Sequence, residues 1–243
     1  MEDFFSRSEA LFGTETMKAL RNTRVILFGV GGVGSWCAET LIRTGLAHLT
    51  LVDGDTVQPS NVNRQLPATR DTIGRPKVEV LKERLLTINP IAEIEAVYEN
   101  YYADGKTDSG ADLKIGEYDY VIDAIDSVAA KTDLIIYATR VRGVKVFSSM
   151  GAALRFDPTK VTTGELMEIK GDALAKAVRA RMKKIGLHPY RKVKCVYSTE
   201  QALQCETRGS LMQVTAVFGC TLASMVINDL RKKQVTSVHY KMT

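Results

Sequence analysis

The chain has 243 residues, of which 45% are hydrophobic and 25% are charged, and its formal net charge is +5. This composition is ordinary for a soluble globular protein with a sizeable core. The four cysteines, Cys37, Cys195, Cys205 and Cys220, are widely spaced without a C-x-x-C pair, so neither a disulfide framework nor a four-cysteine zinc site is expected. The N-terminal residues show no signal-peptide core, and we expect a cytoplasmic protein.

The pattern of apolar residues predicts strands that alternate with helices. In chain order, the expected elements are helices over 7–13 and 16–22, a strand over 24–28, a helix over 35–44, a strand over 49–52, a helix over 69–89, a strand over 91–98, a loop over 104–110, a strand over 118–122, a helix over 128–141, a strand over 144–147, a strand pair within 152–163, a helix over 172–185, a strand over 193–197 and a helix over 211–230. This order indicates an α/β fold with a Rossmann-like, doubly wound and mostly parallel sheet. We expect a single domain over 1–243, with a core over 1–150 and a small α+β extension over 151–243.

A glycine-rich motif follows the first strand directly. The run Gly29-Val30-Gly31-Gly32-Val33-Gly34 fits G-x-G-x-x-G, and Asp53 ends the next strand 19 residues after Gly34. In such a motif the first glycine permits a tight turn, the second lets the backbone approach a phosphate, and the third packs the helix against the strand. The helix start favours an anion, and Asp53 is placed to bind ribose hydroxyls. The pattern therefore indicates a nucleotide site.

Further motifs narrow the class of protein. They are Asp53-Gly54-Asp55, Ser60-Asn61-Val62-Asn63-Arg64-Gln65, Gly74-Arg75-Pro76-Lys77 and Asp123-Ala124-Ile125-Asp126-Ser127. With the glycine motif, they resemble the ThiF/MoeB family of adenylating enzymes, the superfamily of the ubiquitin-activating enzymes, over about residues 7–150. The resemblance implies an enzyme in which a carboxylate attacks the α-phosphate of ATP, which gives an acyl-adenylate and pyrophosphate.

The resemblance also implies roles for individual residues. Arg64, Lys77 and the partner subunit's Arg7 would supply positive charge to the phosphates, so a homodimer is implied. Asp126 would hold Mg²⁺, and Asp53 would bind the ribose. The implied cofactor-binding set is Gly29, Gly31, Gly32, Gly34, Asp53, Asp55, Asn63, Arg64, Gln65, Lys77 and Asp126. Taken singly, Asp126 is also typical of a helix cap, Arg64 of a structural donor, and Lys77 and Arg7 of solvated charges.

The C-terminal part bears on the substrate. Residues 176–194 hold eight lysines or arginines and no acid. The order RSEALFG, GVGGVGSW, DAIDSVAAK, FDPTK, a basic helix and KCVYSTE resembles the tRNA threonylcarbamoyladenosine dehydratases, a branch of the same family. That resemblance implies adenylation of the threonyl carboxylate of the modified tRNA nucleoside, followed by ring closure that expels AMP. The candidate tRNA contacts are Lys176, Arg179, Lys183, Lys184 and Arg191, for which a solvated helix face is the alternative.

Two C-terminal features stay open. Cys205 lies in an irregular stretch, 198–210, where other superfamily members place an acyl or sulfur acceptor, and Arg208 would favour its thiolate. A partner pair of cysteine desulfurase and sulfur acceptor, and a monovalent cation, are compatible with the sequence. The uncharged stretch 211–228 is interrupted by polar residues, which favours a buried core or dimer-interface helix over a membrane span.

Three other functions remain as alternatives. The same chemistry could activate the C-terminus of a ubiquitin-like sulfur carrier protein. An NAD-dependent dehydrogenase would share the glycine motif and Asp53, but it would give no role to Arg64, Lys77 or Asp126. A nucleotide-binding scaffold without turnover is the alternative that is not an enzyme.

Overall fold

The computed structural model describes residues 4–205 and 209–241, with side chains as far as residue 233. Its helices are α1 (Ser6–Phe12), α2 (Thr14–Asn22), α3 (Gly34–Thr44), α4 (Lys77–Ile88), α5 (Val128–Arg140), α6 (Ala173–Ile185) and α7 (Met212–Lys241). Its strands are β1 (Arg24–Phe28), β2 (His48–Val52), β3 (Glu93–Val97), β4 (Tyr101–Ala103), β5 (Lys106–Thr107), β6 (Tyr120–Asp123), β7 (Lys145–Ser149), β8 (Val161–Glu165) and β9 (Lys194–Ser198). Short 3-10 helices are η1 (Pro59–Asn61), η2 (Arg70–Thr72), η3 (Ile115–Glu117) and η4 (Pro158–Lys160).

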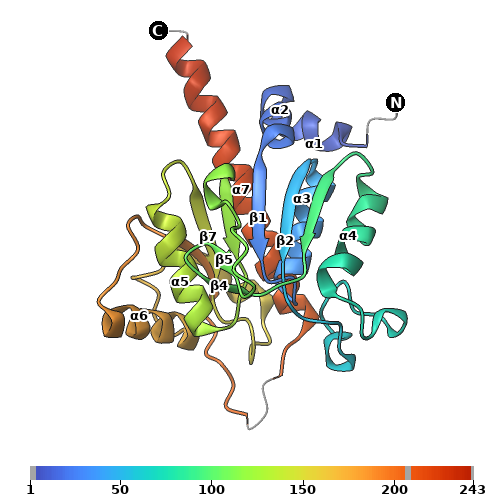
Figure 1. Cartoon of the computed structure of the whole chain (residues 1–243). Coiled ribbons are helices and arrows are strands. Elements are labelled where there is room, and N and C mark those ends of the chain that lie inside the picture. The colour runs from blue at the N-terminus through green and yellow to red at the C-terminus, as the bar shows by residue number, and fades with distance from the viewer. Residues whose placement is uncertain (1–3, 206–208, 242–243) are drawn as a thin grey trace.

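The central sheet has the strand order β3-β2-β1-β6-β7-β9-β8 (Figure 1). Neighbouring strands are parallel, except that β8 runs antiparallel to β9. The register places Phe28 of β1 beside Val52 of β2 and Asp123 of β6, so these three strands end level with one another. The strand order reverses between β1 and β6, which is where doubly wound sheets bind ligands. The predicted fold class is confirmed.

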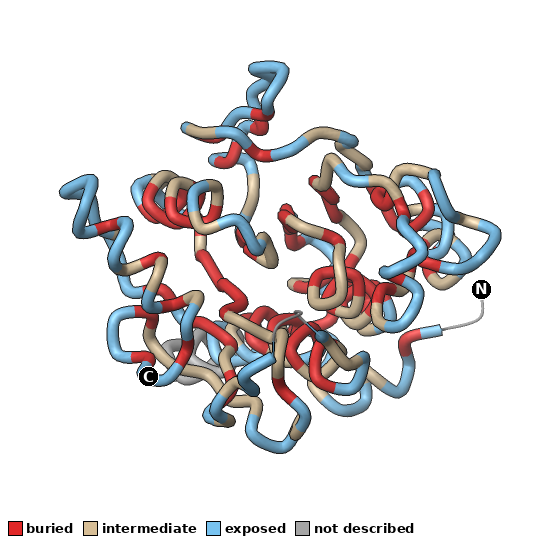
Figure 2. Tube along the Cα trace, turned by 90° about the horizontal axis from the view of Figure 1, so that it is seen from below, coloured by how far each residue is buried: buried red, intermediate tan, exposed pale blue. Residues whose placement is uncertain are grey.

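Helices cover both faces of the sheet (Figures 1 and 2). Val25 and Leu27 of β1 pack in one core with α3, α4 and α7, whereas Ile26 and Phe28 pack in the other with α5 and α6. Because both sides of the strand are buried, the strand is apolar at consecutive positions. Burial of each aliphatic side chain stabilises the fold by about 1.5–3 kcal/mol. The site-bearing end of the sheet is therefore built on a rigid, two-sided core.

Helix α7 packs closely along α3. A Cβ placed on Gly219 would lie 2.4 Å from the Val33 carbonyl oxygen and 2.7 Å from Trp36 Cβ, so only glycine permits this approach. The segment Met212–Lys233 is long and apolar enough to cross a membrane, with a mean hydropathy of 1.2 over its most apolar 18 residues. However, 50% of this 18-residue stretch is buried inside the protein. The core helix of a soluble protein has the same properties, and the contacts with α3 make α7 a core helix along this stretch.

We expect Gly219→Ala to destabilise the protein, although the same change in the middle of a helix normally stabilises it by up to about 1 kcal/mol. The added methyl group would overlap backbone and side-chain atoms of α3. Overpacking of this kind costs about 1–3 kcal/mol, which lowers the midpoint of thermal unfolding by several degrees. Calorimetry measures the shift. Gly116→Ala is the control, because its Cβ would make only an ordinary contact of 3.6 Å; equal midpoints for the two variants would contradict the packing account.

The helix predicted over 69–89 begins only at Lys77, so the first part of that prediction is wrong. Pro76 forms a bridge with Thr56 and is the N-cap residue of α4 rather than part of its first turn. The residue before a proline disfavours helical backbone, which sets Arg75 outside the helix. The pairing with Thr56 brings the start of α4 beside the end of β2.

The loop predicted over 104–110 contains strand β5, which pairs with β4 in a hairpin. Its turn is Asp104-Gly105, with φ angles of 50° and 76°. An aspartate followed by a glycine is typical of hairpin turns that need positive φ at both positions. The Asp104-Gly105 pair is therefore a hairpin signal in the sequence, and the prediction of a loop over the whole of 104–110 is wrong.

The strand pair predicted within 152–163 is also wrong. Only its last residues belong to a strand, β8, and the partner of β8 is β9. The N–H groups of Phe156 and Asp157 donate to the Glu200 carboxylate at 3.0 Å. The Glu200 side chain thus accepts the hydrogen bonds that these N–H groups would have donated to a second strand. The final helix, predicted to end at 230, continues to Lys241.

Candidate active site

The glycine loop joins β1 to α3 and lies against the turn that follows β6. Gly29 has a φ of 84°, and a Cβ on it would lie 2.8 Å from the Ala124 carbonyl oxygen. A Cβ on Gly34 would lie 1.8 Å from the Gly29 carbonyl oxygen. Both positions therefore require glycine for packing, as the motif predicts. The tight turn leaves the start of α3 facing the switch point between β1 and β6.

The segment with Asn63, Arg64 and Gln65 lies directly on this loop. A Cβ on Gly31 would lie 3.6 Å from Gln65 Nε2, and one on Gly32 would lie 3.3 Å from Arg64 Cγ. The structure therefore brings together two predicted motifs that are about 30 residues apart in the sequence. Their arrangement is that of a phosphate-binding loop with a basic side chain at its edge.

Asp53 is fixed at the tip of β2. Its carboxylate accepts the Val30 N–H at 2.8 Å and the Asp55 N–H at 2.9 Å, so it bridges the glycine loop and its own turn. Burial raises the pKa of the Asp53 carboxyl above its ordinary value, although nearby Lys77 and these two N–H groups oppose the shift. A rigid, partly buried carboxylate at this position suits ribose hydroxyls, which donate hydrogen bonds.

Arg64 is half-buried and held in place through its side chain. One guanidinium nitrogen, Nη1, donates to the Ser60 carbonyl oxygen and to Asn63 Oδ1, both at 2.9 Å. Asn63 in turn donates to the Ser210 carbonyl oxygen at 2.9 Å, which ties this loop to the segment before α7. The buried Gln65 Oε1 has no hydrogen-bond partner in the described residues. An unpaired acceptor beside a glycine loop is suited to a donor group on a ligand.

Lys77 and Asp55 form an ion pair at the edge of the crevice. Lys77 begins α4, its side chain is only 6% exposed, and its Nζ lies 2.7 Å from Asp55 Oδ2. The Asp55 carboxylate is 67% exposed. The ammonium group is therefore held in a fixed position by a carboxylate in contact with solvent. A more highly charged phosphate can attract such an ammonium group from its partner.

Asp126 lies on the turn after β6 and is exposed. Within residues 4–205 and 209–233 its carboxylate has neither a hydrogen bond nor an ion pair. Ser127, not Asp126, caps α5 by accepting the Ala130 N–H, so the alternative of a helix cap is excluded for Asp126. No group of three or more His, Cys, Asp or Glu able to hold a metal occurs in the described residues. One free carboxylate fits Mg²⁺ that is held chiefly by phosphates, which is how proteins usually bind this ion.

Arg7 is not part of the crevice within its own chain. It is exposed on α1, which lies with α2 at the opposite end of the molecule from the glycine loop (Figure 1). A Cβ on Gly45, at the C-terminal end of α3, would meet Met17 of α2 and Phe5 just before α1. This end of α3 is the far end from the glycine loop. Arg7 therefore lies far from the glycine loop of its own chain.

Cysteines differ sharply in their surroundings. Cys205 is exposed on the segment before α7, and Arg208, predicted to favour its thiolate, lies outside the described residues. Cys37 and Cys195 are buried, and burial raises the pKa of both thiols. The two buried thiols therefore stay protonated and act as small hydrophobic residues.

The basic C-terminal segment divides into two groups. Lys176, Lys183 and Lys184 are exposed on α6 and have no partner within the described chain. Arg179 instead donates to the Leu166 carbonyl oxygen at 2.9 Å, and Arg191 donates to two backbone carbonyl oxygens at the end of α5. Arg179 therefore holds α6 to the segment after β8, Arg191 ties the extension to α5, and the three lysines present their charge to solvent.

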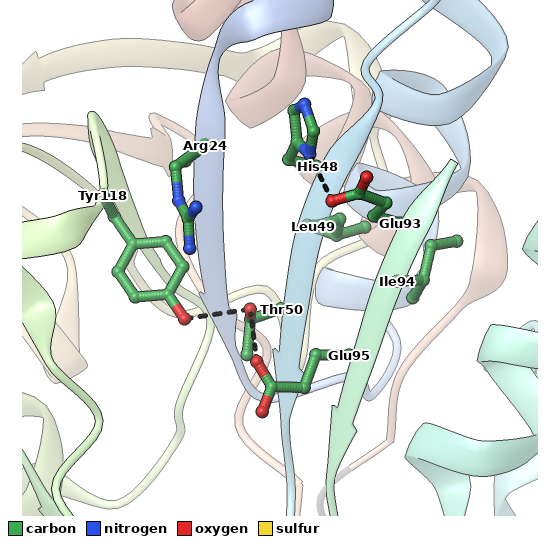
Figure 3. A pocket seen from close by; sticks show the side chains of 8 residues that line it. All are labelled: Arg24, His48, Leu49, Thr50, Glu93, Ile94, Glu95 and Tyr118. Atoms are coloured by element: carbon green, nitrogen blue, oxygen red, sulfur yellow. Dashed lines mark hydrogen bonds and ion pairs between the residues drawn. The ribbon is translucent and has the colours of Figure 1, made fainter. Parts of the chain in front are cut away.

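A groove of about 260 Å³ opens at the other end of the sheet, where β1, β2 and β3 begin (Figure 3). Its charged groups pair with one another or with neighbours: His48 contacts Glu93 at 3.0 Å, and Thr50 contacts Glu95 at 3.3 Å. None of the predicted site residues lines it. The groove is therefore separate from the crevice at the strand ends.

Some residues that shape the crevice belong to no predicted set. The Trp36 indole N–H donates to the Arg64 carbonyl oxygen at 3.1 Å, Thr215 of α7 lies beside the glycine loop, and Asn100 packs against the turn after β2. Trp36 follows the glycine motif closely and could have been suspected from the sequence. Thr215 and Asn100 approach from distant parts of the chain and carry no local signal.

Comparison with known proteins identifies the family of this chain. The model of the ThiF family matches residues 5–243. This chain belongs to the ThiF family. The ThiF family protein is 35% identical over 253 residues to the tRNA threonylcarbamoyladenosine dehydratase of Haemophilus influenzae, which covers 96% of this chain and 95% of the relative. The resemblance stated from the motifs is confirmed.

Two further relatives of this ThiF family protein are informative. The crystal structure of Escherichia coli tRNA N6-threonylcarbamoyladenosine dehydratase in complex with ATP matches with a TM-score of 0.86 at 33% identity, over 96% of this chain and 95% of that one. Escherichia coli molybdopterin-synthase adenylyltransferase is 37% identical over 123 residues, but this covers only 51% of this chain and 47% of that relative. The likeness to the dehydratases thus includes the extension, whereas that to the adenylyltransferase covers half of the chain.

Proposed function

We propose that this ThiF family protein is an ATP-dependent tRNA threonylcarbamoyladenosine dehydratase. It adenylates the threonyl carboxylate of N6-threonylcarbamoyladenosine in tRNA, and ring closure then releases AMP after pyrophosphate has left. The observation that carries the proposal is the meeting of the glycine loop with Asp53 and the Asn63–Gln65 segment, in a chain that matches the Haemophilus influenzae dehydratase over 96% of its length. The match to the ATP complex of the Escherichia coli enzyme supports ATP as the nucleotide.

The crevice of one chain offers groups suited to binding the nucleotide and to stabilising the attack on it. The glycine loop and the N-terminus of α3 bind phosphate, and Asp53 holds the ribose. Arg64 and Lys77 stabilise the charge that develops when the carboxylate attacks the α-phosphate. Asp126 would hold Mg²⁺, which neutralises phosphate charge when bound. The nucleophile that closes the ring belongs to the substrate, so the enzyme needs no thiol acceptor, and Cys205 has no required role.

A homodimer completes the site in this proposal. Arg7 of the partner subunit would add a third positive charge beside the phosphates, and the position of α1 supports this, because α1 lies at the opposite end of its own chain from the glycine loop. The Arg7→Ala variant can be mixed with a variant whose own crevice is inactivated. Recovery of part of the activity in the mixture is expected, since half of the sites in mixed dimers would be intact.

Pyrophosphate exchange distinguishes the proposed substrate from a sulfur carrier. The protein is incubated with ATP, Mg²⁺ and labelled pyrophosphate, together with either modified tRNA or a small protein that ends in Gly-Gly. We expect label to enter ATP with the tRNA only, and the threonylcarbamoyl nucleoside to lose one water. Exchange with the small protein alone would contradict the proposal and favour the function of the adenylyltransferase relatives.

We expect Lys183→Glu/Lys184→Glu to raise the KM for tRNA about tenfold or more without changing the KM for ATP. Exposed lysines that contact phosphates contribute binding energy that weakens with salt. The variant should also show a shallower dependence of tRNA affinity on salt concentration. Arg70→Glu/Lys82→Glu, with the same change in net charge, is the control on η2 and α4. An equal loss in both variants would show that only the net charge matters.

A further inference from the structure

A buried lysine lies behind the crevice, on the second turn of α5. The Lys131 side chain is 0% exposed, and its Nζ donates to Asp123 Oδ2 at 2.6 Å, to Ser148 Oγ at 3.3 Å and to the Ser149 carbonyl oxygen at 2.9 Å. An ammonium group has three protons, so its donors are fully used. Asp123 is also 0% exposed and accepts the Ser148 hydroxyl. These residues form one closed polar cluster.

The cluster joins the ends of two strands to a helix. Asp123 ends β6, Ser148 and Ser149 end β7, and Lys131 belongs to α5. A buried ion pair is weak evidence for stability, because apolar residues of similar volume often stabilise a fold as well or better. The polar cluster instead restricts orientation, because each hydrogen bond favours a particular angle as well as a distance. The strand ends are therefore held in one orientation.

The second carboxylate oxygen of Asp123 links the buried cluster to the turn after β6, which lies against the glycine loop. Asp123 Oδ1 accepts the Ile125 N–H at 3.0 Å, which shapes the turn after β6. Ala124, inside this turn, donates its N–H to the Phe28 carbonyl oxygen at 2.8 Å. Its own carbonyl oxygen lies against Gly29. The turn is thus clamped between the buried cluster and the glycine loop.

Asp126 is the next residue after this clamp. Its carboxylate has no hydrogen bond or ion pair to any described residue, so its position depends on the backbone that carries it. That backbone is fixed on one side by Asp123 and on the other by the glycine loop. A metal-holding carboxylate must be oriented to a fraction of an ångström for full activity. The cluster is the part of the described structure that supplies this support.

We propose that Lys131 is a positioning residue for the adenylation reaction, which acts through Asp123 to orient Asp126 toward the Mg²⁺ held with ATP. The inference rests on the proposed function, in which Asp126 holds Mg²⁺. Lys131 touches neither ATP nor substrate in this account. Loss of the cluster therefore raises the Mg²⁺ requirement and lowers kcat, while the affinity for ATP without metal stays nearly unchanged.

The test uses Asp123→Asn/Lys131→Met, which removes both buried charges together and avoids an unpaired one. We expect the Mg²⁺ concentration for half-maximal pyrophosphate exchange to rise about tenfold, with less than a threefold change in the ATP Kd measured in EDTA. Arg155→Met/Asp172→Asn removes the other fully buried ion pair of the described residues and should leave the Mg²⁺ dependence unchanged. A wild-type Mg²⁺ dependence in the Asp123/Lys131 variant would overturn the inference.

A further comparison separates this inference from the proposed function. Asp126→Asn should itself raise the Mg²⁺ requirement, and in that background the Asp123/Lys131 changes should have little further effect, because they act through Asp126. If Asp126→Asn behaves as the wild type, the proposed metal role fails. If it is impaired and the two sets of changes are additive, only the role of Lys131 fails. Ser148→Ala is a milder change in the same cluster and should also raise the Mg²⁺ requirement. It provides the test if the double variant does not fold.

Discussion

Lys77→Ala is expected to lower kcat/KM for pyrophosphate exchange by about 10²–10³. Lys77 is the buried ammonium group at the start of α4, and its 6% exposed side chain is aimed at the crevice edge by Asp55. Negative charge accumulates on the phosphates in the transition state, and a fixed cation in a site with little water stabilises it strongly. Removal of one such group from an active site typically costs about 3–4 kcal/mol.

The fold should tolerate this change. After loss of the ammonium group, Asp55 stays 67% exposed and remains solvated, so no buried charge is left without a partner. We expect the midpoint of thermal unfolding to fall by only a few degrees. Lys82→Ala on the same helix is the control, because Lys82 has no partner among the described residues. Activity of Lys77→Ala within threefold of the control would show that Lys77 takes no part in the reaction.

Gly34→Ala is expected to abolish detectable ATP binding and to destabilise the protein. A Cβ at this position would lie 1.8 Å from the Gly29 carbonyl oxygen, far inside the contact distance of two atoms. The glycine loop and the start of α3 must separate to admit it, which removes the oriented N–H groups that bind phosphate. Overpacking typically costs about 1–3 kcal/mol, and backbone overlap of this degree exceeds that range.

Gly31→Ala provides the matched comparison for Gly34→Ala. Its Cβ would make an ordinary contact of 3.6 Å with Gln65, so the fold should keep its stability. The methyl group would nevertheless occupy space that a phosphate needs, and the ATP Kd should rise about tenfold or more. Calorimetry of unfolding and titration with ATP measure the two effects separately. Equal stability of the two variants would contradict the packing assigned to Gly34.

Much of the site could be predicted because its residues follow strands that end together. Gly29 follows β1, Asp53 follows β2 and Asp126 follows β6, and the parallel register brings these ends to one edge of the sheet. Arg64 and Gln65 come from a loop with a specific motif, and the structure places that motif on the glycine loop. These features depend on local sequence and on a general rule of doubly wound sheets.

Other features depend on contacts between distant segments and have no local signal. Gly219 is required because α7 meets α3 closely, which no pattern within α7 reveals. Glu200 satisfies the backbone near Asp157, so that stretch does not become a strand although its composition suits one. Lys131 has the pattern of an ordinary surface charge on a helix, and only the fold brings the neighbouring ends of β6 and β7 to its ammonium group. The role of the partner subunit's Arg7 stays a prediction.

The central claim is that the threonyl carboxylate of the tRNA nucleoside attacks the α-phosphate of ATP in this crevice. The most direct measurement uses tRNA in which that carboxylate carries heavy oxygen, with mass spectrometry of the products. We predict that each AMP released carries one heavy oxygen atom and that pyrophosphate carries none. Unlabelled AMP, or label in pyrophosphate or phosphate, would contradict it.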